Sequence, residues 1–87
     1  MNKHFEDTRY YLKRATETAT KGIREELEPI ESRFRVLTGK EDEEPEPSRI
    51  AAIREELKAL EERAEGEAKE AIADARSKLK AYRKSVD

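Results

Sequence analysis

Apolar residues recur every three or four positions along both halves of the chain, and a polar stretch separates the two halves. In the first half the repeat runs from Phe5 to Leu37, and in the second it runs from Ile50 to Tyr82. This spacing places apolar side chains on one face of an α-helix. Each half is therefore predicted to form one long amphipathic helix.

The two apolar stripes mirror each other about the polar stretch. Residues whose numbers sum to 87 match in character, so that Leu37 faces Ile50 and Phe34 faces Ile53. This pattern predicts an all-α fold, an antiparallel two-helix hairpin packed like a coiled coil. The residues expected in its core or in contacts with a partner are Leu12, Ile23, Leu27, Ile30, Phe34, Leu37, Ile50, Ile53, Leu57, Leu60, Ile72 and Leu79.

Capping residues and prolines set the expected boundaries within a single domain, residues 1–87. The first helix is predicted over about 3–38, an acidic loop over 39–48 and the second helix over about 49–84. Gly39 occupies the place of a left-handed C-cap, and Ser48 is placed to cap the second helix. Each arm is then about 54 Å long, at about 1.5 Å per residue.

Pro29 conflicts with an unbroken first helix, because a proline inside a helix removes a hydrogen bond and clashes with the preceding turn. One interpretation is a kink near Glu25, and the other is a break after which a new helix begins at Pro29. The apolar spacing continues unchanged through Leu27, Ile30 and Phe34. We therefore favour the kink.

Small residues collect where the middles of the two arms face each other. They are Ala19, Gly22, Ala64, Gly66 and Ala68. The favoured interpretation is a close approach of the two helices, and the alternative is a slot for a side chain of a partner.

A two-helix hairpin buries only one stripe per helix, which rarely stabilises so small a domain without further support. A second face of the second helix carries small residues at seven-residue spacing, which are Ala52, Ala59, Gly66 and Ala73. The residues that flank the stripe of the first helix are Tyr11, Gly22 and Val36. Surface alanines are good helix formers, so this face needs no contact. The alternative is a contact face. We expect the hairpin to dimerise into a four-helix bundle or to bind a helical protein partner.

The amino-acid composition limits the class of protein and its expected location. Charged residues make up 46% of the chain and hydrophobic residues 34%, whereas an ordinary domain is about 25% charged. Cysteine is absent, so no disulfide is expected. No stretch is apolar enough to predict a membrane span or a signal peptide. We expect a cytoplasmic protein.

Charge is unevenly distributed along the sequence. Residues 1–24 and 69–87 each carry six basic and three acidic side chains, and residues 25–68 carry seven basic and fifteen acidic. A straight hairpin would therefore have a basic tip at its termini and an acidic tip at its loop. Binding of nucleic acid or an anionic surface at the basic tip is the alternative function. Its candidate contacts are Lys69, Arg76, Lys80, Arg83 and Lys84.

Acids interrupt the basic tip, since Glu70 and Asp74 lie among its lysines and arginines. A solvated surface with ion pairs between residues four apart is the favoured interpretation, and nucleic acid is not the expected partner. Catalytic signals are weaker still. His4 is the single histidine, and no Glu-x-x-His motif accompanies the acids for a metal site. We expect no enzyme activity, no cofactor and no metal, and favour a structural or protein–protein interaction module.

Four segments carry a resemblance to a family of short haloarchaeal proteins of unknown function. They are the opening MNKHFEDTRYYLKRA, the central REELEPIESR with RVLTG, the connection EDEEPEPSR, and LEERAEGEAKEAI. The resemblance implies a cytoplasm rich in potassium salt, where a very acidic surface is usual. This chain departs from that composition, because its 19 basic residues nearly balance 21 acids. The resemblance supplies no functional residues.

Overall fold

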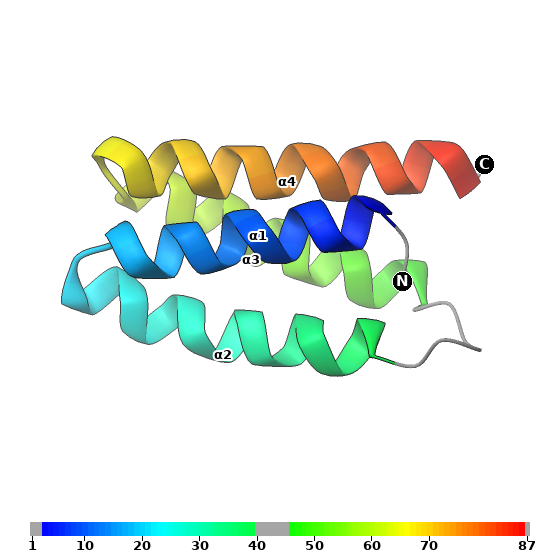
Figure 1. Cartoon of the computed structure of the whole chain (residues 1–87), viewed down its shortest axis with the longest axis horizontal. Coiled ribbons are helices and arrows are strands. Elements are labelled where there is room, and N and C mark those ends of the chain that lie inside the picture. Colours follow the sequence, from blue (N-terminus) through cyan, green and yellow to red (C-terminus); the bar gives the residue numbers. More distant parts are fainter. Residues whose placement is uncertain (1–2, 40–45, 87) are drawn as a thin grey trace.

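The computed structural model describes residues 3–39 and 46–86, with side chains described as far as residue 81. Within these ranges it has four α-helices, which are α1 (Lys3–Thr18), α2 (Lys21–Thr38), α3 (Pro47–Arg63) and α4 (Gly66–Val86). Each helix packs against the next one in the chain, and α1 closes the ring by packing against α4. The result is a four-helix bundle within one chain, in which neighbouring helices are antiparallel (Figure 1).

The predicted two-helix hairpin, with unbroken helices over 3–38 and 49–84, is wrong. The first arm is interrupted between Thr18 and Lys21, and the second between Arg63 and Gly66. Both interruptions lie near the middle of an arm, so the hairpin folds back on itself and its two halves share one core. The molecule is 35 Å long, against about 54 Å for a straight arm. A second chain is not needed to complete the bundle.

A pair of aromatic rings demonstrates the folding back directly. The rings of Phe5 in α1 and Phe34 in α2 meet edge to face, with their centroids 5.7 Å apart. On one continuous helix, these two residues would be separated by about 44 Å at about 1.5 Å per residue. The contact is therefore incompatible with a continuous first helix.

Threonines and one arginine donate hydrogen bonds to backbone carbonyls beside the interruption between α1 and α2. The hydroxyls of Thr16 and Thr18 donate hydrogen bonds to carbonyls four residues earlier, which disturbs a helix slightly. The Arg24 guanidinium then donates to the carbonyls of Thr16, at 3.2 Å, and Ala19, at 3.3 Å. These carbonyls would otherwise lack a partner at the end of the helix. The chain can thus leave the helix here at low cost.

The second interruption depends on glycine. Ala64 is extended, and Gly66 begins α4 with φ at 65°. This left-handed conformation penalises every residue that has a Cβ, and glycine adopts it freely. Gly66 therefore turns the chain from α3 into α4.

The structure tests three further predictions about where helices begin and end. Gly39 has right-handed φ and ψ of −78° and −13°, so the predicted left-handed cap is wrong. Glu46, not Ser48, is the N-cap of α3, because Pro47 already occupies the first turn, where its missing N–H costs nothing. Helix α2 continues through the exposed Pro29, so no new helix begins there. Residues 40–45 of the predicted loop lie outside the described residues.

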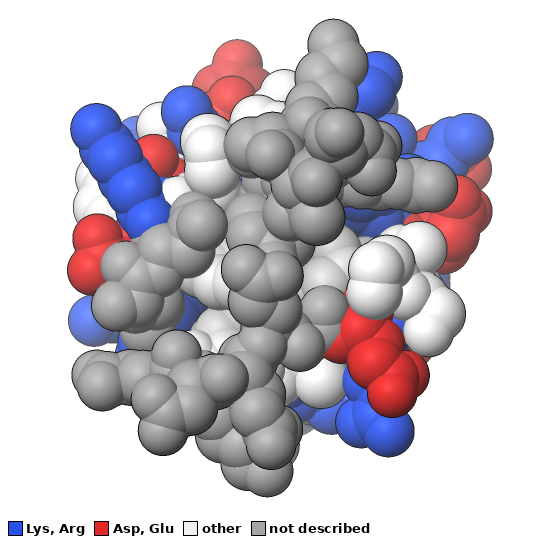
Figure 2. All heavy atoms as spheres, turned by 90° about the vertical axis from the view of Figure 1, so that its right-hand side faces the viewer, with Lys and Arg blue, Asp and Glu red and all other residues white. Residues whose placement is uncertain are grey.

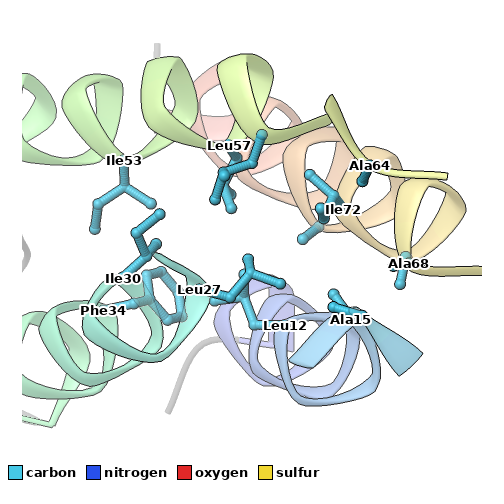
Figure 3. Packing of buried hydrophobic residues seen from close by; sticks show 14 of the residues in the cluster. Leu12, Ala15, Leu27, Ile30, Phe34, Ile53, Leu57, Ala64, Ala68 and Ile72 are labelled. Carbon is cyan, nitrogen blue, oxygen red and sulfur yellow. The ribbon is translucent and has the colours of Figure 1, made fainter. Parts of the chain in front are cut away.

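The core contains side chains of unequal size on the four helices (Figure 3). Helices α2 and α3 contribute large residues, including Leu27, Phe34 and Leu57, whereas α4 contributes three alanines. Helices α1 and α4 make the most extensive contact, and α2 and α3 make the least. Small side chains let helix backbones approach closely, and large ones hold them apart.

Most residues predicted for the core are buried. Leu37 is half-buried at its edge, and the others are fully enclosed: Leu12, Ile23, Leu27, Ile30, Phe34, Ile50, Ile53, Leu57, Leu60, Ile72 and Leu79. They face one another inside a single chain, so their burial requires no partner. Of the small residues in the middle of the arms, Ala19, Ala64 and Ala68 are buried, whereas Gly22 and Gly66 are exposed.

Candidate functional site

A groove at the surface runs between α2 and α3, and we refer to it as the apolar groove. Its volume is about 420 Å³, within the range of about 300–1,000 Å³ that is typical of ligand pockets. Ile53 is almost fully buried beneath it, Leu37 is half-buried, and Val36 is 74% exposed. Its lining residues are Ser32, Arg33, Val36, Leu37, Arg49, Ala52 and Ile53.

The size of the core residues explains why the groove lies at this position. Ile30, Phe34, Ile50 and Ile53 fill the space between α2 and α3 and keep the two helices apart. Ala52 is exposed on α3 and is too short to cover the resulting gap. Apolar surface is therefore left open to solvent along this seam.

Arginines form the charged rim of the apolar groove. Arg33 pairs with Glu56 at 2.5 Å and Arg49 lies 3.8 Å from Glu46, while both arginine side chains remain more than half exposed. A guanidinium has five N–H donors, so these pairs leave donors free. Among the described residues, none that lines the groove is acidic. The rim is thus suited to carboxylates of a partner.

The alanines and Val36 that the sequence analysis assigned to a second contact face do not all lie together in the structure. Val36 and Ala52 come together in the apolar groove, although they belong to different halves of the chain. Ala73 lies elsewhere, in a hollow between α3 and α4, and Ala59 is exposed on α3. A regular seven-residue spacing indicated these alanines. The sequence did not indicate the groove, because its width depends on the separation of α2 from α3.

The hollow between α3 and α4 is polar, and we refer to it as the basic hollow. Its volume is about 480 Å³, and its lining residues are Arg54, Glu55, Lys58, Glu61, Ala73, Arg76, Ser77 and Lys80. Of the residues predicted to contact an anion, Arg76 and Lys80 line it, whereas Lys69 is exposed outside it. The side chains of Arg83 and Lys84 lie outside the described residues.

The prediction of two oppositely charged tips is wrong, because it assumed a straight hairpin. The end of α2 and the start of α3 lie at the same end of the bundle as the start of α1 and the end of α4 (Figure 1). Figure 2 views this end, and lysines and arginines alternate around it with aspartates and glutamates. Among the described residues, basic and acidic side chains therefore share this end of the bundle.

Helices α2 and α3 are also joined by an ion pair near their other ends. Nη1 of Arg63 donates a hydrogen bond to Oε1 of Glu26 at 2.9 Å, and Nη2 of Arg63 lies 2.7 Å from Oε2 in an ion pair. This hydrogen bonding lowers the pKa of the Glu26 carboxyl below its ordinary value of 4.5, and the pKa of Arg63 is raised in turn. The pair bridges α2 and α3 beyond the apolar groove.

The described residues offer no group of three or more histidine, cysteine, aspartate or glutamate side chains that could hold a metal ion. His4 is half-buried at the start of α1. In the same part of the chain, no helix is both long and apolar enough to cross a membrane.

Comparison with known families places nearly the whole chain in one family. The chain belongs to DUF7553, a family of unknown function. The match covers residues 1–85. No curated protein and no solved structure matches the chain. DUF7553 supplies no functional residues, and the haloarchaeal setting stays a prediction.

Proposed function

We propose that this DUF7553 protein is a non-enzymatic protein-interaction module that binds an amphipathic helix of another protein in the apolar groove. The observation that supports the proposal is the groove itself, where Val36, Leu37 and Ala52 present apolar surface between two antiparallel helices. An amphipathic helix binds such a groove by inserting side chains spaced three and four residues apart.

The arginines on the rim of the apolar groove determine which kind of amphipathic helix we expect it to bind. Arg33 and Arg49 stand on opposite sides of the groove, on α2 and α3, and both retain unused donors. Carboxylates on either flank of a bound helix would form charge-assisted hydrogen bonds with them. The proposed partner therefore has an apolar face flanked by glutamates or aspartates.

The expectation of dimerisation rests on the thin core of a two-helix hairpin. That reason no longer applies, since the four helices enclose the predicted core residues within one chain. A partner protein is therefore favoured over a second copy of this chain as the occupant of the groove.

Two designed peptides test the proposal. Both are 18-residue amphipathic helices with the same leucine face, and the flanks carry glutamates in one and lysines in the other. We expect the glutamate peptide to shift the amide signals of Val36, Leu37, Ala52 and Ile53 in the ¹⁵N-labelled whole chain, and to bind at least tenfold more tightly than the lysine peptide.

Two alanines of α3 provide matched variants. Ala52→Glu places a charge in the groove, and Ala59→Glu places the same charge on an exposed site of the same helix, outside the groove. The first should weaken binding of the glutamate peptide at least tenfold, and the second should leave it within twofold. Equal loss in both variants would contradict the proposal. Shifts in the groove that grow with protein concentration, without peptide, would instead assign it to a second copy of the chain.

A further inference from the structure

The basic hollow contains cations that have no acidic partner. Arg54 and Lys58 lie one turn apart on α3, and Lys80 lies across from them on α4. Within the described part of the chain, none of these three forms an ion pair. Like charges around one hollow repel each other, and an anion bound between them would relieve that repulsion.

One ion pair neutralises the deeper part of this site. Arg76 on α4 binds Glu61 on α3 at 2.5 Å, and both side chains are mostly buried, at 32% and 23% exposure. The pair holds the two helices together and removes Glu61 as a competitor for the remaining cations. The lining then presents three unpaired cations and one other acid, Glu55.

Small residues make the hollow accessible. Ala73 and Ser77 lie one turn apart on α4, and Ser77 is exposed. A hydroxyl, a guanidinium and two ammonium groups are together suited to phosphate, which accepts several charge-assisted hydrogen bonds at once.

We propose that the basic hollow binds a compact anion made of linked phosphate groups, held by Arg54, Lys58 and Lys80. The site is separate from the apolar groove, which lies between α2 and α3 and shares no lining residue with it. Exposed acids on the same two helices, Glu62, Glu70 and Asp74, would repel a long phosphate backbone. The ligand is therefore a small oligophosphate and not a nucleic acid.

Titration of the ¹⁵N-labelled whole chain with sodium tripolyphosphate tests the site at constant ionic strength. We expect saturable shifts of amide signals at Arg54, Lys58, Ser77 and Lys80. The double variant Lys58→Gln/Lys80→Gln should weaken binding at least tenfold. Lys21→Gln/Lys69→Gln is the matched control, because it removes two exposed lysines outside the hollow and changes the net charge equally. Its affinity should stay within twofold of the original chain.

Three results would overturn the proposal. These are the absence of saturable shifts, equal loss of affinity in the two double variants, or tighter binding of a twelve-residue oligothymidylate than of tripolyphosphate. Helical circular dichroism and the thermal midpoint should be the same in both double variants, so that loss of binding is not caused by unfolding. Ala52→Glu should leave the titration unchanged, which separates this site from the apolar groove.

Discussion

The seam between α1 and α4 and the seam between α2 and α3 are built from the same kind of helix but pack differently. The first seam includes small buried side chains, from Ala15 of α1, Ala19 just after the end of α1, and Ala68, Ala71 and Ala75 of α4. Leucine, isoleucine and phenylalanine fill the other seam. The first pair makes extensive contact and the second little, and the apolar groove lies between α2 and α3. The size of core residues thus determines where the bundle exposes apolar surface.

The largest expected effect concerns the side chains that hold α2 and α3 apart. Leu57 is fully buried, and Leu57→Ala should lower the free energy of unfolding by about 2–5 kcal/mol, because it leaves a cavity. Leu37→Ala, at the half-buried edge of the groove, should cost less than half as much. Urea denaturation measures both. A loss near zero for Leu57→Ala would show that this core does not form.

The reverse substitution compares the two seams directly. Ala15→Leu adds volume inside the close contact of α1, where Ala15 is fully buried, and should cost about 1–3 kcal/mol. Ala52→Leu makes the same change in the apolar groove, where space is available, and should alter stability by no more than about 0.5 kcal/mol. Chemical denaturation of the two variants gives the comparison. Equal losses would mean that the seams are packed alike.

A glycine pair tests the turn that allows the chain to fold back. A Cβ at either Gly66 or Gly22 would have no neighbour within 4 Å, so crowding affects neither. Gly66→Ala should destabilise by about 1–2 kcal/mol, because the φ of 65° is left-handed. Gly22→Ala, inside α2, should stabilise by up to about 1 kcal/mol. Thermal melts distinguish the signs. Stabilisation by Gly66→Ala would rule out this turn.

The smallest effect concerns the ion pair between α2 and α3. The pKa of Glu26 is lowered by Arg63, so the pair stabilises the fold above pH 4.5 and this contribution is lost as pH falls through the lowered pKa. Arg63→Gln should return the pKa of Glu26 toward its ordinary value. Arg33→Gln should not, since Arg33 pairs with Glu56. Carboxyl ¹³C titration measures both. An unchanged Glu26 pKa in Arg63→Gln would contradict the pairing.

Much of the fold was predictable from the spacing of apolar residues. The mirror between the arms anticipates that α1 lies beside α4 and α2 beside α3, because both pairs are also neighbours in a straight hairpin. The interruptions were missed because the apolar period continues across them, from Ala15 through Ala19 to Ile23. Two features of the sequence lie beside the interruptions. Gly66 is interpreted from the sequence as a small residue that allows close helix approach, and the alternating Thr16, Thr18 and Thr20 are not part of that interpretation.

The candidate sites were less predictable. Arg76 and Lys80 were identified as basic residues, but their gathering with Arg54 and Lys58 requires α3 to lie beside α4, which a straight hairpin does not allow. Val36 and Ala52 were noted as apolar residues off the main stripe. Their meeting in one groove follows from the separation of α2 and α3, which depends on packing in three dimensions.

Small-angle X-ray scattering over a dilution series tests most directly whether one chain forms the whole bundle. We predict a particle with the 10.1 kDa mass of a single chain, whose Cα atoms have a radius of gyration of 12.0 Å and extend over 35 Å. The mass should not change on dilution. A particle longer than about 50 Å would contradict the folded-back bundle and restore the straight arms, at about 1.5 Å per residue. The mass of two chains at every concentration would contradict a single-chain particle.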